Sequence, residues 1–339
     1  MAELSLALSQ LDLPLVHPFK ITRGEESVSH TALFRLHWRA LEGLGESSPI
    51  PRYGESIESI YAWYREHPIH GDDPYLTHAL LEGIPSAARC GLDIALHDLM
   101  GKDLGKPLYR LLGLDPQLTP TTSFTIGISK PELTLQKIAE IGSHPVIKVK
   151  LGLGSLQDQV ATIELVRSKY GGAIRLDANE GWTPESAVQI LKELHRYDIE
   201  FCEQPIPAGS PEKLRYIRDH SAIPIVTDED SKDASDLPAL RGCVDGINVK
   251  LVKCGGICGA LAMIHTARAL KLKVMLGCMV ESAILSTAAA HLSPLVDWAD
   301  LDGPFLTAQD PFAGVTYDNG KLILPDGPGL GVRELARVD

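Results

Sequence analysis

The chain has 339 residues, of which 44% are hydrophobic and 22% are charged, and a formal net charge of −12. This length exceeds one ordinary core and favours a large domain joined to a smaller one. The negative charge is spread along the chain without an acidic or basic tail, which argues against a nucleic-acid partner, because such a partner requires a basic face. No apolar run approaches the roughly 20 residues that span a bilayer.

The start of the chain and its cysteines indicate a cytoplasmic protein. Residues 1–15 have no basic region followed by an uninterrupted apolar core, so they do not resemble a signal peptide. The six cysteines are scattered, and the only close pair, Cys254 and Cys258, has no second Cys/His pair at zinc-finger spacing. We therefore expect reduced thiols, most of them in the core.

The first 115 residues predict an α+β unit. Residues 31–38 are rich in β-branched and aromatic types, which favours a strand. A turn-rich stretch follows, and helical patterns then occupy residues 57–66, 75–82 and 85–101. Strands followed by helices are typical of α+β domains.

Residues 116–315 predict a parallel (β/α)₈ barrel. Short apolar strands alternate with amphipathic helices at about 25-residue spacing, the rhythm of a parallel sheet that closes on itself. After residue 311 the sequence is β-like again, and residues 316–339 are expected to return to the first domain. The predicted strands cover residues 121–126, 146–151, 173–178, 199–202, 225–227, 246–251, 273–276 and a short stretch near 298–301, and the predicted helices include 157–169, 184–196, 260–270 and 282–291.

Polar residues at the carboxyl ends of barrel strands form the active site in this architecture. The second predicted strand ends in Lys148 and Lys150, and their spacing of two residues puts both ammonium groups on one face. The next four strands end in residues that follow Lys150 at intervals of 27, 26, 25 and 22 residues, one βα unit each: Asp177, Glu203, Asp228 and Lys250. We expect these side chains to lie at matching heights around the barrel.

This set of residue types predicts metal-assisted proton transfer. Three converging buried carboxylates cannot all stay ionised without a cation, and oxygen ligands favour one Mg²⁺ ion per site, with Mn²⁺ as an alternative. Removing a proton from the carbon next to a carboxylate places a second negative charge on that group, which a bound metal stabilises. Lysines on two opposite walls allow removal on one face and return on the other, the geometry of a racemase or epimerase.

Neighbouring residues offer alternative assignments. Glu229 and Asp230 follow Asp228 closely and could compete with it as ligands, but strand alternation favours Asp228. Lys253 is a weaker candidate than Lys250, because it lies past the strand in the turn before the Gly-Gly pair, where we expect it to be exposed.

At these residues the sequence resembles the enolase superfamily and, within it, the muconate-lactonizing-like subgroup. The resemblance implies a modified barrel under a capping domain made by residues 1–115 and 316–339. It assigns Mg²⁺ to Asp177, Glu203 and Asp228, and proton transfer to Lys150 and Lys250, with Lys148 beside them. The matching segments are residues 148–150, 176–179, 203–205, 228–229 and 248–256. The family often has Ser where this chain has Asp230.

Further matches within the superfamily are to dipeptide epimerases. Residues 299–304 resemble their DxD signature, in which two aspartates hold the α-ammonium of the substrate, and Asp300 and Asp302 would offer two acceptors on one strand face. Residues 276–279, with Cys278 and Met279, match the same group.

The capping loops suggest the substrate side chain. Residues 21–24 and 51–56 resemble the substrate loops of L-Ala-D/L-Glu epimerases. The resemblance places Arg23, with Arg52 as a second candidate, where a guanidinium binds a γ-carboxylate bidentately. It implies inversion of the C-terminal residue of L-Ala-D/L-Glu-type dipeptides, in murein peptide recycling.

Other activities stay open at this point. An epimerase for hydrophobic or cationic dipeptides would use the same scaffold. An N-acylamino-acid racemase, an o-succinylbenzoate synthase or a cycloisomerase would share the metal and lysines, but its substrate has no free ammonium for Asp300 and Asp302. A Schiff-base aldolase barrel needs one lysine and no carboxylate triad. A homo-oligomer is also compatible with the sequence.

Overall fold

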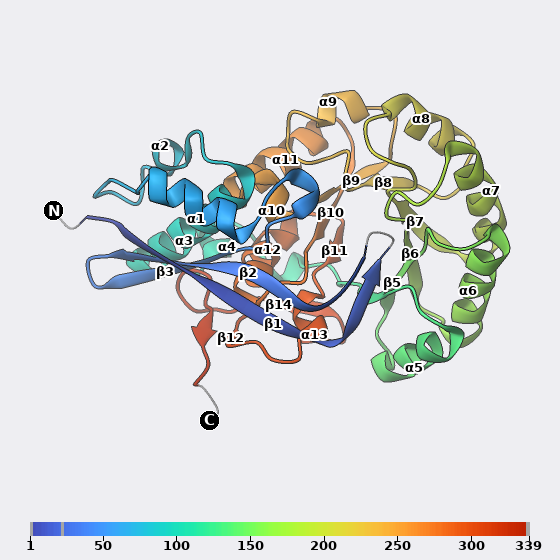
Figure 1. The fold of residues 1–339 in the computed structure, drawn as a ribbon, viewed down its shortest axis with the longest axis horizontal. Coiled ribbons are helices and arrows are strands. Elements are labelled where there is room, and N and C mark those ends of the chain that lie inside the picture. Colours follow the sequence, from blue (N-terminus) through green and yellow to red (C-terminus); the bar gives the residue numbers. More distant parts are fainter. Residues whose placement is uncertain (1–2, 22–23, 337–339) are drawn as a thin grey trace.

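The computed structural model describes residues 3–21 and 24–336 and contains a capping unit and a barrel (Figure 1). The cap begins with a three-stranded antiparallel sheet in the order β1-β2-β3. Its strands are β1 (Ser5–Ile21), β2 (Gly24–Trp38) and β3 (Leu41–Ser47), and its helices are α1 (Ile57–Glu66), α2 (Thr77–Leu81), α3 (Ser86–Leu104) and α4 (Leu108–Leu111). The strand and the three helices expected in this part are therefore present.

Helix α3 lies directly on strand β3. A Cβ atom at Gly45 would overlap the carbonyl oxygen of Gly91, and one at Gly43 would overlap that of Ala95. Glycine at these two positions therefore permits the close approach of helix and strand. The same helix buries Leu92, which has no exposed surface.

The barrel sheet has eight parallel strands in the order β11-β10-β9-β8-β7-β6-β5-β4, as predicted. An isolated bridge between Thr122 and Ala299 brings the first strand beside the last, so the barrel is nearly closed. The strands are β4 (Phe124–Ile126), β5 (Val146–Lys150), β6 (Ala173–Asp177), β7 (Ile199–Glu203), β8 (Ile225–Thr227), β9 (Gly246–Val249), β10 (Lys273–Gly277) and β11 (Trp298–Asp300).

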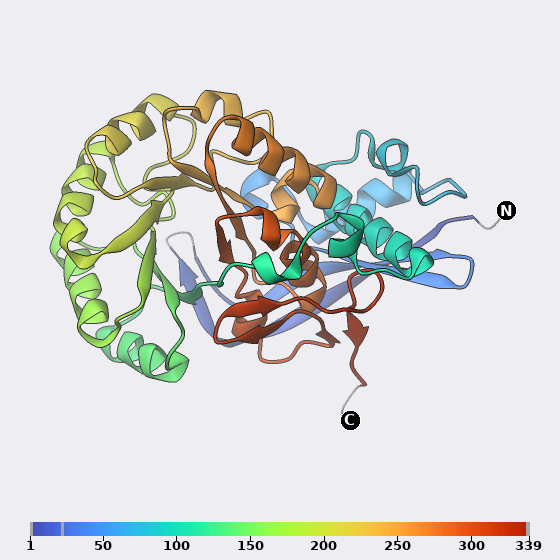
Figure 2. The same cartoon turned by 180° about the vertical axis from the view of Figure 1, so that it is seen from behind.

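Helices follow the barrel strands and form its outer layer (Figure 2). Capping boxes start α6 at Ser155 and α7 at Thr183, where each side chain accepts a backbone N–H three residues on. The helices are α5 (Pro131–Ile141), α6 (Leu156–Lys169), α7 (Pro184–Leu194), α8 (Pro211–Asp219), α9 (Leu237–Leu240), α10 (Leu251–Cys254), α11 (Ile257–Ala269), α12 (Ala283–Leu292) and α13 (Gly303–Leu306). Within the described residues, no helix has the length and apolar content needed to cross a membrane.

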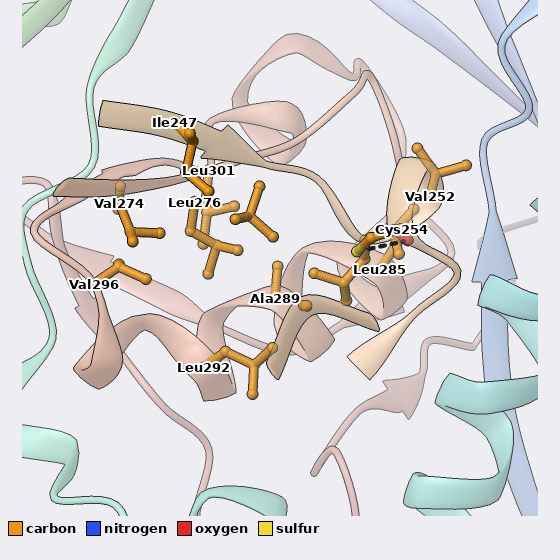
Figure 3. Packing of buried hydrophobic residues seen from close by; sticks show 14 of the residues in the cluster. Ile247, Val252, Cys254, Val274, Leu276, Leu285, Ala289, Leu292, Val296 and Leu301 are labelled. Atoms are coloured by element: carbon orange, nitrogen blue, oxygen red, sulfur yellow. Dashed lines mark hydrogen bonds between the residues drawn. The ribbon is translucent and has the colours of Figure 1, made fainter. Parts of the chain in front are cut away.

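The two faces of the barrel strands have different packing partners. Outward-facing residues pack against the helices, and Figure 3 shows Ile247, Val274 and Leu276 with Leu285 and Ala289 of α12. Inward-facing residues below the strand ends form a separate buried cluster of Phe201, Val226, Met275 and Trp298. Because side chains alternate along a strand, the positions two residues beyond Phe201 and Trp298 also face inward: Glu203 and Asp300.

The last segment contacts the cap. Strand β12 (Phe312–Ala313) pairs with β15 (Arg333–Glu334), and β13 (Thr316–Asp318) pairs with β14 (Lys321–Ile323). Leu330 N donates to Asp98 Oδ1 of α3 at 2.8 Å, and Glu334 accepts from Arg35 of β2 at 2.6 Å. The domain boundaries at residues 115 and 315 stay a prediction.

Candidate active site

A cavity of about 1200 Å³ lies at the carboxyl ends of the barrel strands, between the barrel and the cap. The cap contributes Ser29, His30 and Arg52 to its lining. Ser29 Oγ also donates to Val280 O at 2.6 Å, which ties strand β2 to the loop after β10. The barrel lines the cavity with residues that include Lys150, Lys250, Cys278, Met279, Asp300 and Asp302.

Three buried carboxylates lie on neighbouring strands, where the sequence places them. Asp177 pairs in register with Lys150 on one side and with Glu203 on the other, and Asp228 directly follows β8. Asn248 Nδ2 donates to Glu203 Oε1 at 2.7 Å, and Asn179 N donates to Asp177 Oδ1 at 2.8 Å. These contacts orient two of the three carboxylates from within the barrel.

Lysine ammonium groups lie among the carboxylates. Lys150 Nζ donates to Asp177 Oδ2 at 2.5 Å, and Lys250 Nζ donates to Asp228 Oδ2 at 2.9 Å. Lys150 ends β5 and Lys250 follows β9, and four of the eight steps around the sheet separate these strands. The two lysines therefore approach the cavity from opposite walls, with the carboxylates between them.

The charges of this cluster are strongly interdependent. Burial, followed by the charge of Asp177, raises the pKa of Glu203 to about 7. Burial also acts to raise the pKa of Asp177, but Lys150 and Lys148 outweigh it and hold that pKa below its usual value. Burial opposes the charged form of Lys250 as well, yet Asp228 and Glu203 raise the pKa of its ammonium.

The donor set fits a hard divalent cation. All three carboxylates are 5% exposed or less, and they lie at the carboxyl ends of three adjacent strands. The raised pKa of Glu203 reflects burial first and then the negative charges of Asp177 and Asp228, and a cation bound by these oxygens would offset both effects. The three side chains offer only carboxylate oxygens, with no thiolate or imidazole among them, and such a ligand set suits Mg²⁺.

Lys148 links the carboxylate cluster to the acidic pair at the end of β11. Its Nζ contacts Asp300 Oδ2 and donates to Glu203 Oε2 at 3.2 Å. Asp300 Oδ1 accepts from Ser123 Oγ at 2.6 Å, and Asp302 Oδ2 accepts from Thr125 N at 2.6 Å. Burial, then the charge of Asp300, raises the pKa of Asp302 to about 6. The two aspartates thus lie together beside the cavity.

Cys278 and Met279 lie in the same wall. The Met279 Sδ is 3.8 Å from Lys250 Nζ, and the Cys278 Sγ is 3.8 Å from Asp302 Oδ1. Burial raises the pKa of the Cys278 thiol well above its ordinary value, so it is protonated and unreactive at neutral pH. All six cysteines are free thiols, four of them buried.

Of the two arginines predicted to bind the substrate side chain, the structure describes only Arg52. Arg23 lies outside the described residues. Arg52, in a 3₁₀ turn after β3, forms a bidentate ion pair with Glu180, with Nη1–Oε2 2.5 Å and Nη2–Oε1 2.6 Å. Glu180 follows the Asp177-Ala-Asn segment of the third barrel unit and was not singled out from the sequence.

One prediction near the site is wrong. Lys253 is not exposed: only 4% of its surface is accessible. It lies in α10, which turns back against the loop after β8, so its Nζ contacts Asp228 Oδ1 and donates to Asp228 O at 2.6 Å and to Ser231 O at 3.1 Å. The strand-end rule misses it because the side chain returns to the site from a helix. Lys250 itself precedes α10, since β9 ends at Val249.

A second group of ligand-type side chains, Asp93, His97 and Cys258, lies where α3 meets α11. Asp93 Oδ2 accepts from Cys258 N at 3.1 Å, in the first turn of α11. The carboxylate therefore caps a barrel helix from the cap, which accounts for its burial.

An eight-stranded parallel barrel under an α+β cap, with acids and lysines at its strand ends, defines an enolase-type architecture. The protein-family model described as "Mandelate racemase / muconate lactonizing enzyme, N-terminal domain" matches residues 7–113. The family model described as "Enolase C-terminal domain-like" matches residues 134–335. The chain belongs to this family of the enolase superfamily.

Relatives with named activities are similar to this chain over nearly its whole length. An L-Ala-D/L-Glu epimerase of Bacteroides thetaiotaomicron is 36% identical and covers 96% of this chain and 86% of its own. The substrate-liganded L-Ala-D/L-Glu epimerase of Bacillus subtilis has a TM-score of 0.93 at 27% identity, covering 99% and 100% of the two chains. A dipeptide epimerase of Enterococcus faecalis, complexed with Mg and L-Leu-L-Tyr, has a TM-score of 0.92 at 32% identity, covering 98% and 99%.

Proposed function

We propose that this protein is a dipeptide epimerase that inverts the α-carbon of the C-terminal residue of L-Ala-D/L-Glu-type dipeptides. The observation that carries the proposal is that Lys150 and Lys250 lie on opposite barrel walls, on either side of three carboxylates at adjacent strand ends, and each contacts one of them. The activities named for its relatives support the same reaction class. We place the activity in cytoplasmic recycling of murein peptides.

Asp177, Glu203 and Asp228 would hold one Mg²⁺ ion, or Mn²⁺ in its place. Bound there, the metal supplies electrostatic stabilisation of the negative charge that develops on the substrate carboxylate when the α-proton leaves. Asn248 and Asn179 keep two of these carboxylates oriented.

The two lysines carry the proton. One neutral amine removes the α-proton from one face of the carbon, and the ammonium on the opposite wall returns a proton to the other face. Net inversion follows because the departing and arriving protons use different faces. Lys148, bound to Glu203 and Asp300, is assigned the role of holding these two acids and adding positive charge beside Lys150.

Asp300 and Asp302 are assigned to the free α-ammonium of the dipeptide. Both carboxylates are buried and line the cavity, and because Lys148 already contacts Asp300, the substrate ammonium would be a second cationic partner for the pair. Substrates of N-acylamino-acid racemases, o-succinylbenzoate synthases and cycloisomerases lack this ammonium, so the acidic pair favours a dipeptide over them. Cys278 and Met279 would form the adjoining wall of the substrate site.

Arg23 and Arg52 are assigned to an acidic substrate side chain. The alternative is a hydrophobic or cationic dipeptide, and the engagement of Arg52 with Glu180 is the observation that favours it. A panel of L-Ala-L-X dipeptides, with acidic, neutral and basic X, separates these substrates.

Incubation with L-Ala-L-Glu and Mg²⁺ in D₂O tests the proposal. Proton NMR should show loss of the Glu α-proton signal and formation of the L,D diastereomer, and chelation should stop both. Absence of α-deuterium exchange with every dipeptide would refute the function. A borohydride-trapped lysine adduct that forms after chelation would favour the Schiff-base aldolase instead.

A further inference from the structure

The ion pair between Arg52 and Glu180 joins the cap to the barrel at the edge of the cavity. Arg52 lines the cavity and keeps 35% of its side-chain surface exposed, whereas only 8% of the Glu180 side chain is exposed. Glu180 Oε1 also accepts from Ala208 N at 2.9 Å, and Glu180 N donates to Gln204 O at 2.9 Å. The barrel therefore holds the carboxylate in place, and the guanidinium comes to it from the cap.

The backbone at Glu180 is unusual for non-glycine residues. Asn179 has φ 43° and Glu180 has φ 66°, two successive residues in the left-handed region. Each such residue is disfavoured by roughly 1 kcal/mol or more, so the surrounding contacts must enforce the turn. A Cβ at Gly181 would collide with the backbone of Gly152, which explains the glycine that completes the turn. The turn points the Glu180 side chain toward the cap rather than along β6.

The pair changes what the cavity offers to an incoming substrate. Both terminal nitrogens of Arg52 are bound to Glu180, and the carboxylate cancels the positive charge of the guanidinium. A substrate carboxylate must therefore compete with Glu180 for the bidentate hydrogen bonds of the Arg52 guanidinium. A neutral side chain meets no such competition.

We propose that Glu180 is a specificity-determining residue that limits recognition of acidic dipeptides by holding Arg52. The inference rests on the proposed dipeptide epimerase function and deepens it. Glu180 acts through Arg52 and is a positioning residue, and the strength of its hold sets the preference between acidic and neutral side chains at the C-terminal substrate residue.

Two substrates of nearly equal shape and different charge, L-Ala-L-Glu and L-Ala-L-Gln, test this. Glu180→Gln keeps the acceptor for Ala208 N and removes the charge. We expect the ratio of kcat/KM for L-Ala-L-Glu to that for L-Ala-L-Gln to rise at least about tenfold, mainly through KM, because a charge-assisted contact becomes available. The double variant Glu180→Gln with Arg52→Gln should lose this gain. Glu185→Gln, an exposed change in the first turn of α7, is the matched control and should leave the ratio unchanged.

The outcomes separate this inference from the proposed function. If the wild-type protein epimerises dipeptides but Glu180→Gln lowers both substrates in parallel, the pair is only structural and the inference is wrong. A gain that persists in the double variant also overturns it, as does a loss of Mg²⁺ affinity in Glu180→Gln, which would show an effect transmitted through Asp177. If the wild-type protein exchanges no dipeptide, the proposed function and this inference fall together.

Discussion

Glu46 of cap strand β3 binds the first residues of barrel helix α12 through Ser282. Its Oε1 accepts from Ser282 N at 3.0 Å, and its Oε2 accepts from Ser282 Oγ at 2.5 Å and from Leu285 N at 3.1 Å. Ser282 is the N-cap residue of α12, so a carboxylate of the cap satisfies the free backbone N–H groups of a barrel helix. The preceding residue, Glu281, accepts from Met279 N at 3.0 Å. Because Glu46 binds Ser282, which directly follows Glu281, the cap is coupled to the loop that carries Met279.

Glu46→Ala should destabilise the protein. The change leaves the N–H groups of Ser282 and Leu285 buried without their acceptor, which costs about 1–3 kcal/mol in the free energy of unfolding. Chemical denaturation measures this loss. Glu42→Ala on the same strand breaks a partly exposed ion pair with Arg35 and should cost under about 1 kcal/mol. Equal losses in the two variants would contradict a capping role for Glu46.

Lys150→Ala and Lys250→Ala should each reduce epimerisation by at least about 10²–10⁴-fold, the range typical of acid–base groups. Each variant keeps the three carboxylates, so calorimetry should still detect Mg²⁺ binding. Each should also retain exchange of only one substrate diastereomer in D₂O, because one face keeps its lysine. Lys192→Ala on the exposed face of α7 is the control. Equal loss of metal affinity in both site variants would mean that their roles are misassigned.

Asp302→Asn should weaken binding of a free ammonium. The variant keeps an acceptor but loses the negative charge, and we expect the KM for L-Ala-L-Glu to rise about tenfold or more. N-acetyl-L-Ala-L-Glu, which has no ammonium, is the matched substrate, and any turnover of it should be unaffected or improved. If both substrates lose activity in parallel, Asp302 supports the fold of the β11 end through Thr125 and does not recognise the ammonium.

The barrel and its charged cluster are predictable because they follow from local periodicity. One βα unit separates each of Lys150, Asp177 and Glu203 from the next, and parallel pairing then places them in register. A strand period of two likewise predicts that Lys148 and Lys150 share a face, and both contact Asp177. These relationships need no knowledge of the loops.

Two residues that sequence reasoning misplaces or misses, Lys253 and Glu180, reach the site from a helix and from a loop. Lys253 returns to Asp228 because α10 reverses direction directly after β9, which spacing does not reveal. The position of the Glu180 side chain depends on two successive residues with left-handed backbone conformations, which no local sequence pattern predicts. Thr125 was within reach of the strand-end rule, because it lies near the end of β4, but it acts through its backbone N–H and its side chain gives no signal.

His291 lies where three parts of the chain meet. It belongs to α12 and has no exposed surface. Tyr109 N of α4 donates to its Nδ1 at 3.3 Å, which places the proton on Nε2, 3.0 Å from Leu330 O in the last segment. Protonation of His291 Nδ1 would place an N–H donor opposite the Tyr109 N–H donor, and the hydrogen bond between them would be lost. Burial lowers the pKa of His291 from 6.5 to about 4.

This shift predicts a pH-dependent loss of stability. Between about pH 6.5 and pH 4 the unfolded chain binds a proton at this position that the native protein does not bind, so stability falls as the pH is lowered. The full loss in the free energy of unfolding is about 3 kcal/mol, because each unit of pKa shift corresponds to about 1.4 kcal/mol. His291→Gln should remove it, so the difference in unfolding free energy between wild type and variant should shrink by that amount from pH 7 to pH 4. His220→Gln, at an exposed position after α8, should track the wild type. Parallel pH profiles for wild type and His291→Gln would show that another group controls acid unfolding.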